Sequence, residues 1–153
     1  MATSRVQLAL NVTDLEEATR FYRDFFGVEP AKRRARYVNF AIADPPLKLV
    51  LLENPGAASA LNHLGVEAPS TDEVAAATAR FAAAGLETRS SSEERCCHAV
   101  QDKVWITAPD VPHGGWEFYT VLADDPEPSA SDDTVGCCTS DPAAPADACC
   151  ATA

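Results

Sequence analysis

Six cysteines, arranged as three adjacent pairs, are the residues of this sequence most suited to chemistry. Adjacent Cα atoms lie about 3.8 Å apart, below the usual disulfide range, so a bridge within a pair would be strained. Two neighbouring thiolates instead offer two ligands to one soft, thiophilic atom. The alternative is that they are ordinary loop cysteines. The pairs are Cys96 with Cys97, Cys137 with Cys138, and Cys149 with Cys150.

Gln7, His63 and Glu117 form a second set of candidate ligands. An imidazole, a carboxylate and an amide oxygen can occupy one side of a metal ion and leave other positions open, as in non-haem Fe(II) oxygenases. Each residue alone is more simply explained as a solvated or hydrogen-bonded side chain. Their matched positions in two similar halves of the sequence favour a joint metal site. Lys48, roughly the counterpart of Glu117, cannot ligate as an ammonium, which indicates an open site rather than a closed structural one.

The strands that position these residues are predicted twice along the chain, which indicates an internal duplication. In each half the first strand alternates in polarity, so its side chains point to two faces. Later strands of each half are bounded by turn residues such as proline and glycine. The predicted strands are 5–12, 37–42 and 47–53 in the first half, and 63–67, 104–108 and 116–122 in the second.

Each first strand leads into a predicted helix whose apolar residues recur every three or four positions, as expected for a helix that packs on a core. A capping box marks each beginning and a glycine marks each end. Residues 90–95 are polar with no apolar period, and are predicted to form the loop before the first thiol pair. The capping boxes are Thr13 with Glu16 and Ser70 with Glu73, and the glycines are Gly27 and Gly85.

This order of elements predicts an α+β fold: two βαβββ modules that form a cupped mixed sheet around the metal site. If each helix packs on the apolar face of its sheet, Gln7, His63 and Glu117 line the cavity on the other face. The modules are expected at residues 4–54 and 60–122, within one domain at 4–122. Residues 123–153 contain seven acids, four prolines and no Lys or Arg, and are predicted to be a disordered tail.

Length and charge restrict the class of protein. With 153 residues, 46% of them apolar, the chain can build one domain with a core. The net charge of -11 disfavours nucleic acid and anionic membranes as partners. No apolar run is long enough to span a membrane, and a glutamine lies where a signal peptide would be apolar. We therefore expect a soluble, cytoplasmic protein.

Four segments resemble the vicinal oxygen chelate superfamily, which includes glyoxalase I, the bleomycin resistance proteins and the extradiol dioxygenases. Within it, they are most similar to the carbon-arsenic lyases, once grouped as cadmium-induced proteins. The combination of the first thiol pair with Gln-Asp-Lys-x-Trp is quite specific, and the resemblance covers the predicted domain. The segments are NFAIA at 39–43, PLKLVLLE at 46–53, NHLGV at 62–66 and CCHAVQDKVW at 96–105.

The resemblance implies Fe(II)-dependent, O2-consuming cleavage of trivalent organoarsenicals, such as methylarsenite and reduced aromatic arsenicals, to arsenite. It assigns Gln7, His63 and Glu117 as iron ligands, and Cys96 with Cys97 as the arsenic site. The four cysteines of the tail are then auxiliary thiols, which a flexible chain can return to the cavity mouth.

Two residues depart from the family's pattern. Many members have histidine where Gln7 stands, and an amide oxygen should hold a metal less tightly than an imidazole. Tyrosine commonly follows the thiol pair, where this chain has His98. The first departure bears on metal affinity, and the second on the lining of the substrate loop.

Two other functions fit parts of the sequence. Three thiol pairs would suit a protein that sequesters arsenite or cadmium without turnover. An isomerase resembling glyoxalase I would need four ligands around zinc or nickel, and Lys48 argues against that site. The sequence also leaves open whether the two modules pair within one chain or across a homodimer.

Overall fold

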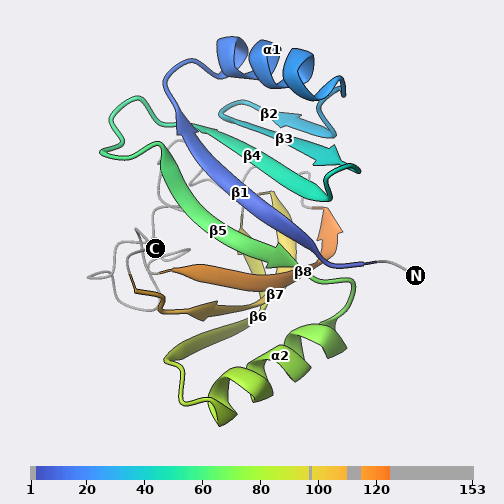
Figure 1. The fold of residues 1–153 in the computed structure, drawn as a ribbon, viewed down its shortest axis with the longest axis vertical. Helices are drawn as coiled ribbons and strands as arrows, with labels where there is room; N and C mark the ends of the chain where they lie inside the picture. The colour runs from blue at the N-terminus through green and yellow to red at the C-terminus, as the bar shows by residue number, and fades with distance from the viewer. Residues whose placement is uncertain (1–2, 97, 110–114, 125–153) are drawn as a thin grey trace.

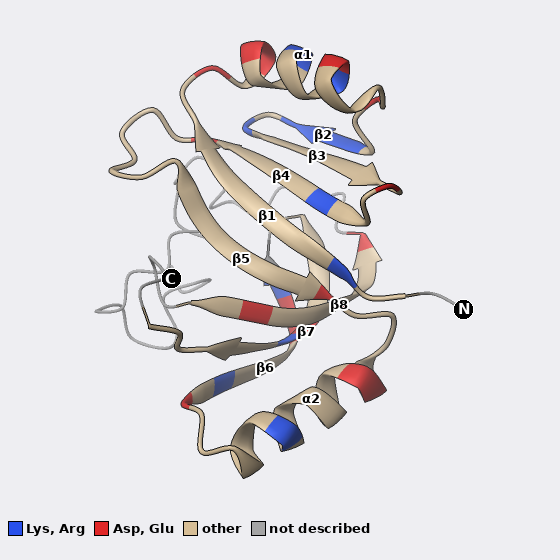
Figure 2. Cartoon of the chain, viewed as in Figure 1, with Lys and Arg blue, Asp and Glu red and all other residues tan. Residues whose placement is uncertain are grey.

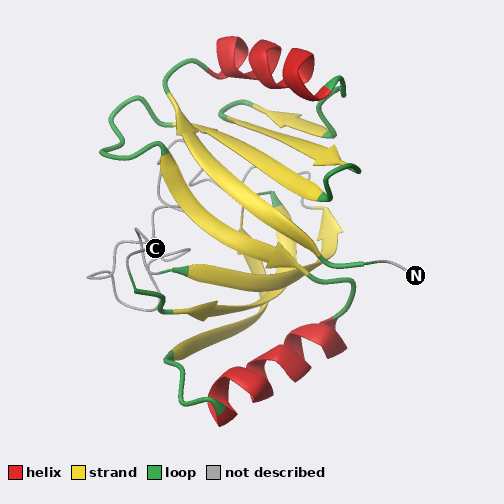
Figure 3. Cartoon of the chain, in the orientation of Figure 1, coloured by secondary structure: helices red, strands yellow, loops and turns green. Residues whose placement is uncertain are grey.

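The computed structural model describes residues 3–96, 98–109 and 115–124. Over these residues the chain forms eight strands and two helices (Figure 1 and Figure 3). In chain order they are β1 (Arg5–Val12), α1 (Leu15–Phe26), β2 (Lys32–Arg34), β3 (Tyr37–Ile42), β4 (Leu47–Glu53), β5 (Leu61–Glu67), α2 (Thr71–Ala83), β6 (Thr88–Cys96), β7 (Ala99–Ile106) and β8 (Trp116–Asp124).

These strands join in one mixed sheet with the order β2-β3-β4-β1-β5-β8-β7-β6. β1 runs parallel to β4, and β5 runs parallel to β8, while the other neighbours are antiparallel. Each half is therefore a βαβββ module, and β1 with β5 joins the two modules within one chain. The sheet curls between α1 and α2, which lie on its outer side (Figure 1). The predicted α+β fold is confirmed.

Helix α1 begins at a different cap from the predicted one. Asp14, rather than Thr13, is the N-cap, and its carboxylate accepts a hydrogen bond from the N–H of Glu17. Both residue types can cap a helix, but a carboxylate also interacts favourably with the positive end of the helix dipole. Gly27 ends the helix as predicted, in the left-handed conformation with a φ of 68°.

Helix α2 begins at the predicted cap. The Ser70 hydroxyl accepts a hydrogen bond from the N–H of Glu73. The C-cap is Ala84, and Gly85 follows it with a φ of 71°. The predicted glycine therefore lies just past the end of the helix.

Each helix encloses an apolar core against the outer face of its module. Side chains alternate between the two faces of a strand, so apolar residues lie under the helices while polar ones face the concave side. Full burial of one large apolar side chain contributes roughly 1.5–3 kcal/mol. The first core contains Leu15, Val38, Phe40, Ile42, Leu49 and Leu51, and the second contains Ala68, Val74, Val104 and Ile106.

The loop predicted at residues 90–95 is wrong, because these residues lie within β6 and pair with β7. β6 is the edge strand of the sheet, where polar side chains are tolerated and discourage pairing with other chains. The register also shifts between Ser91 and Glu94, and Glu93 has a φ of 53°. The bulge interrupts the alternation by which a strand is recognised.

Three strands have bounds that differ from the predicted ones. β5 begins at Leu61 instead of residue 63. β7 covers Ala99–Ile106 instead of 104–108, and β8 continues to Asp124, past the expected end of the domain at Leu122. The disordered tail remains a prediction, because residues 125–153 lie outside the described part of the chain. Neither of the two described helices has the length and apolar character needed to cross a membrane.

Candidate metal centre

Gln7, His63 and Glu117 meet in one pocket on the concave face of the sheet. They come from the adjacent strands β1, β5 and β8, and each is at most 5% exposed. Gln7 Nε2 donates a hydrogen bond to Glu117 Oε1 at 2.6 Å and lies 3.0 Å from His63 Nε2. His63 Nε2 is 3.2 Å from Glu117 Oε1. The polar atoms of all three side chains therefore point to one place.

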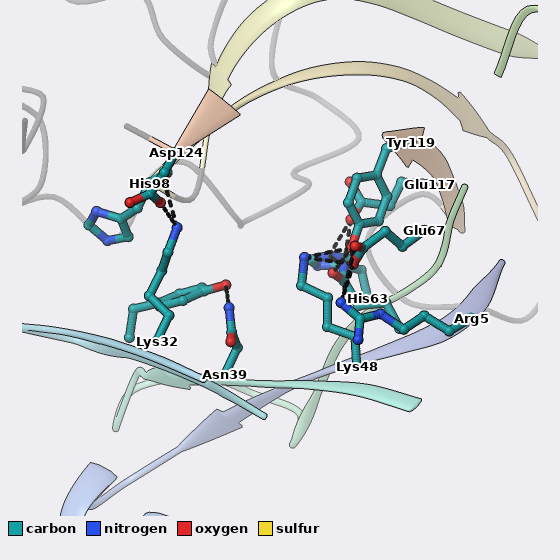
Figure 4. A network of polar contacts seen from close by, with 12 residues as sticks. Arg5, Lys32, Asn39, Lys48, His63, Glu67, His98, Glu117, Tyr119 and Asp124 are labelled. Atoms are coloured by element: carbon teal, nitrogen blue, oxygen red, sulfur yellow. Dashed lines mark hydrogen bonds and ion pairs between the residues drawn. The ribbon is translucent and has the colours of Figure 1, made fainter. Parts of the chain in front are cut away.

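The pocket is small, and most of the residues that line it have polar side chains. Its cavity volume is about 20 Å³, enough for a metal ion or one water molecule. Figure 4 shows three of its lining side chains, Lys48, His63 and Glu117, in one group with Tyr119 and Glu67. The lining residues are Gln7, Tyr37, Lys48, Val50, His63, Gln101 and Glu117.

The register between β1 and β5 relates the two modules by a pseudo-two-fold axis. Gln7 pairs with Gly65, and Ala9 pairs with His63. The axis therefore exchanges Gln7 with His63, and these two candidate ligands hold equivalent positions in the two modules.

The same register corrects the predicted counterpart of Glu117. Glu117 pairs with Gly65 on the parallel strand, and the equivalent residue Ala9 pairs with Val50. Val50, rather than Lys48, therefore takes the place of a fourth ligand. The parallel register of β1 with β4 depends on the packing of the whole sheet. The counterpart of Glu117 therefore cannot be found by counting residues along the sequence. Since valine has no donor atom, the site keeps an open side.

Asn62 holds His63 in the tautomer that a metal requires. His63 Nδ1 lies 2.7 Å from Asn62 Oδ1, so in the neutral ring the proton is on Nδ1 and Nε2 faces the pocket unprotonated. Asn62 can only accept at Oδ1, because its Nδ2 donates to Asn11 Oδ1 at 2.8 Å. Asn62 is the extra residue of a β-bulge in β5, and such bulges re-aim side chains.

We expect Asn62→Leu to weaken divalent metal binding about 10- to 100-fold, as is typical when the hydrogen-bond partner of a ligating histidine is lost. Titration with Co(II), followed by visible absorption, measures the affinity. Asn54→Leu is the matched control, because Asn54 also donates to Asn11 but does not contact His63. Equal affinities for both variants would contradict the role given to Asn62.

Glu117 is ionised although it is buried. Burial raises the pKa of its carboxyl, but the contacts with His63, Lys103 and the Gln7 N–H outweigh burial and lower the pKa to about 2. Lys103 Nζ lies 3.9 Å from Glu117 Oε2. A carboxylate must be deprotonated to bind a metal, so Glu117 is already in the required form.

The Gln7 amide is held by a polar cluster around Tyr119. The Tyr119 hydroxyl donates to Gln7 Oε1 and accepts a hydrogen bond from Lys48 Nζ at 2.9 Å (Figure 4). To bind a metal, the amide must turn so that Oε1 replaces Nε2 in the pocket. Tyr119 can then accept from Gln7 Nε2 and donate to Glu67 Oε2, which is 3.1 Å away. The cluster therefore satisfies both orientations of the amide.

The three side chains fit a divalent metal with open coordination positions. They offer one imidazole nitrogen, one carboxylate oxygen and one amide oxygen, which is a facial set. In the described part of the chain, no group of three or more His, Cys, Asp or Glu side chains could hold a metal. Gln7 is therefore the side chain that would complete a set of three ligands with His63 and Glu117.

The sequence and the fold agree on one family. The family model described as the Glyoxalase/Bleomycin resistance protein/Dioxygenase superfamily matches residues 5–126. The chain belongs to this superfamily. The cadmium-induced protein CadI of Mycobacterium tuberculosis is 62% identical over 123 residues, which cover 79% of this chain and 78% of that protein.

Two further relatives of this superfamily member have names that describe an activity. The trivalent organoarsenical cleaving enzyme of Thermomonospora curvata is 50% identical and covers 89% of each chain. The enzyme of the same name from Bacillus sp. is 34% identical, over 94% of this chain and 88% of its own.

Solved structures share the fold of this superfamily member. A Streptomyces coelicolor methylmalonyl-CoA epimerase has a TM-score of 0.53 at 18% identity, over 80% of this chain and 100% of its own. An extradiol ring-cleaving dioxygenase from B. fuscum has a TM-score of 0.51 at 18% identity, over 78% of this chain and 32% of its own. At this identity the likeness shows the fold alone.

Cys96, the first residue of the first thiol pair of this superfamily member, lies where β6 ends and the hairpin to β7 begins. Cys96 ends β6, and its backbone pairs with Ala99 of β7. The arsenic site remains a prediction, because Cys97 and the tail thiols lie outside the described residues. The tail thiols are Cys137, Cys138, Cys149 and Cys150.

This hairpin is tied to the first module. Lys32 Nζ donates to the carbonyl of His98 at 3.0 Å and also pairs with Asp124 at the end of β8. The rings of His98 and Tyr37 lie 5.3 Å apart, edge to face. β2, which carries Lys32, is entirely basic (Figure 2). Among the described contacts His98 is thus a turn residue that packs on Tyr37.

Three residues that support the site are not among those predicted from the sequence. Asn62 directly precedes the candidate ligand His63, and Tyr119 lies two positions after the candidate ligand Glu117. These positions do not show that the side chains contact the site until the strand register is known. Gly65 carries a recognisable signal, because glycine inside a strand often marks a close approach of another chain segment. A Cβ at Gly65 would lie 2.8 Å from Glu117 Cγ.

Proposed function

We propose that this protein cleaves the carbon-arsenic bond of trivalent organoarsenicals, such as methylarsenite and reduced aromatic arsenicals, with Fe(II) and O2, and releases arsenite. The observation that carries the proposal is the convergence of Gln7, His63 and Glu117 in one pocket of the concave face. The names of the Thermomonospora curvata and Bacillus sp. relatives support the substrate class.

In the proposed reaction, His63 Nε2, a Glu117 oxygen and Gln7 Oε1 would hold the metal. Bound Fe(II) would supply the binding and activation of O2. Cys96 and Cys97 would capture the arsenic atom as a dithiolate, since trivalent arsenic is soft and exchanges oxygen ligands for sulfur. For methylarsenite the atoms balance without a further reductant: CH3As(OH)2 and O2 give As(OH)3 and formaldehyde.

The small pocket suits this division of roles. A volume of about 20 Å³ admits the reacting group next to the ligands but not a whole aromatic arsenical. The rest of the arsenical must therefore lie between the pocket and the hairpin, where Tyr37 and His98 lie. We also propose that the reaction takes place in the cytoplasm, where thiols remain reduced.

The proposal is tested by loading the full chain with Fe(II) without oxygen, adding methylarsenite and air, and measuring arsenite by chromatography. We expect arsenite and formaldehyde in equal amounts, and neither product from protein loaded with zinc. Bound but unconverted methylarsenite with the Fe(II) protein would instead favour the alternative, a thiol-based protein that sequesters arsenic or cadmium without turnover.

We expect the variant Gln7→His to be active and to bind Fe(II) several-fold more tightly than the natural sequence. An imidazole is a stronger ligand than an amide oxygen, and it removes the need for the amide to turn. Calorimetric titration with Fe(II) without oxygen measures the affinity, and arsenite formation measures the activity. A folded variant that binds iron but forms no arsenite would show that the amide itself takes part.

A further inference from the structure

Gln101 places an unpaired amide in the same pocket. It lies on β7, is 6% exposed and lines the pocket with the three candidate ligands. Within the described part of the chain, its side chain makes no hydrogen bond, unlike the other buried amides Gln7, Asn39 and Asn62. Buried polar groups are nearly always paired, and leaving one unpaired is costly. An unpaired buried amide that lines a pocket is therefore available to hydrogen-bond a small polar group that enters it.

The register of β7 places Gln101 between the two halves of the proposed site. Ala99, Gln101 and Lys103 alternate onto the concave face, because side chains of a strand alternate. Ala99 pairs with Cys96 at the hairpin, and Lys103 Nζ reaches to 3.9 Å from Glu117 Oε2. A molecule that is held at the hairpin and extends to the candidate metal ligands must pass Gln101.

The charges around the pocket favour a neutral ligand. Lys48 Nζ lies 2.9 Å from Glu67 Oε2, and Lys103 Nζ lies 3.3 Å from Glu94 Oε1. Both buried ammonium groups are thus already balanced by carboxylates, and the Glu117 carboxylate is left for a metal ion, so an anionic organic ligand would have no counter-ion. A carboxamide both donates and accepts hydrogen bonds, so its complement is a group with the same double capacity, such as a hydroxyl.

We infer that Gln101 binds a hydroxyl of a neutral dihydroxy ligand, which reaches into this pocket with that hydroxyl. The inference rests on the proposed function, for which this ligand is the hydrated trivalent arsenical R–As(OH)2. Gln101 donates from Nε2 to one hydroxyl oxygen and accepts at Oε1 from a hydroxyl proton. Gln101 thereby selects for hydroxylated arsenicals and holds them beside the hairpin before thiols displace the hydroxyls as water.

The test uses methylboronic acid, which has the same CH3–X(OH)2 form but no stable bond to thiols. It is titrated into the metal-free full chain without diols in the buffer, and the side-chain amide signals of Gln101 are followed by NMR. Gln101→Leu keeps the volume and removes the amide. Thr120→Val is the matched control, because Thr120 is equally buried in β8 but alternates away from Glu117 and Tyr119.

We expect methylboronic acid to shift the Gln101 amide signals, and Gln101→Leu to weaken its binding roughly three- to tenfold, the usual effect of one neutral hydrogen bond. Thr120→Val should leave the dissociation constant unchanged. Because no partner is lost, Gln101→Leu should keep or raise the melting temperature. A variant of Gln101 with lower melting temperature and unchanged binding would show that the amide is structural.

An absence of binding to the natural sequence would also overturn the inference. The arsenite assay with Fe(II) tests the proposed function separately, because the titration with methylboronic acid needs neither metal nor turnover. A chain that forms no arsenite with Fe(II), but binds methylboronic acid through Gln101, would lose its proposed activity and keep this subsite.

Discussion

We expect His63→Ala and Glu117→Ala each to abolish arsenite formation from methylarsenite, while both variants still bind the arsenical. His63 and Glu117 offer the strongest metal-binding atoms of the pocket, an imidazole nitrogen and a carboxylate oxygen, and these atoms lie only 3.2 Å apart. No described neighbour can replace either of them as a ligand. Loss of a partner that merely supports a ligand costs about 10- to 100-fold in metal affinity, and loss of the ligand itself should cost more. In the proposed reaction the thiols capture the arsenical, so we expect capture to be unaffected.

Two measurements separate these roles. Co(II) absorption reports the metal site, and arsenic bound per chain after gel filtration reports the thiols. Glu53→Ala is the control, because Glu53 ends β4 and contacts Arg36 outside the pocket. If either His63→Ala or Glu117→Ala failed to bind the arsenical, the separation of capture from oxygen chemistry would be wrong.

The second large effect is expected from Gly65→Ala, the addition of a single methyl group. Its Cβ would lie 2.8 Å from Glu117 Cγ and 3.2 Å from the Glu117 carbonyl oxygen. The backbone of Glu117 pairs with Gly65 in the sheet and cannot withdraw, so the carboxylate must leave its place. We expect metal affinity to fall by more than tenfold, and the free energy of unfolding to fall by about 1–3 kcal/mol, as in other overpacked sites.

Metal titration and thermal unfolding of the same variant measure the two effects. Gly56→Ala is the matched control, because a Cβ at Gly56 meets nothing within 4 Å. Wild-type metal affinity in Gly65→Ala would mean that Glu117 has more freedom than the close contact indicates, and that its placement does not depend on this glycine.

The sequence by itself determined the fold class and the three candidate ligands. The order of elements repeats, and strand side chains alternate with a period of two, so residues at equivalent positions must share a face. Gln7 and His63 can be matched in this way by their positions along the chain alone. The cap at Ser70 and the glycine after α1 depend on hydrogen bonds within a few residues, which local sequence specifies.

Only the tertiary structure decided which residues surround these ligands. Val50 rather than Lys48 is the counterpart of Glu117 in the other module. A bulge places Asn62 beside His63, and the polar strand β6 lies at the edge of the sheet. Each of these depends on a register between strands far apart in the chain, which is set by the packing of the whole sheet. The unpaired amide of Gln101 follows from the same cause, because a missing partner becomes visible only when every neighbour has been placed.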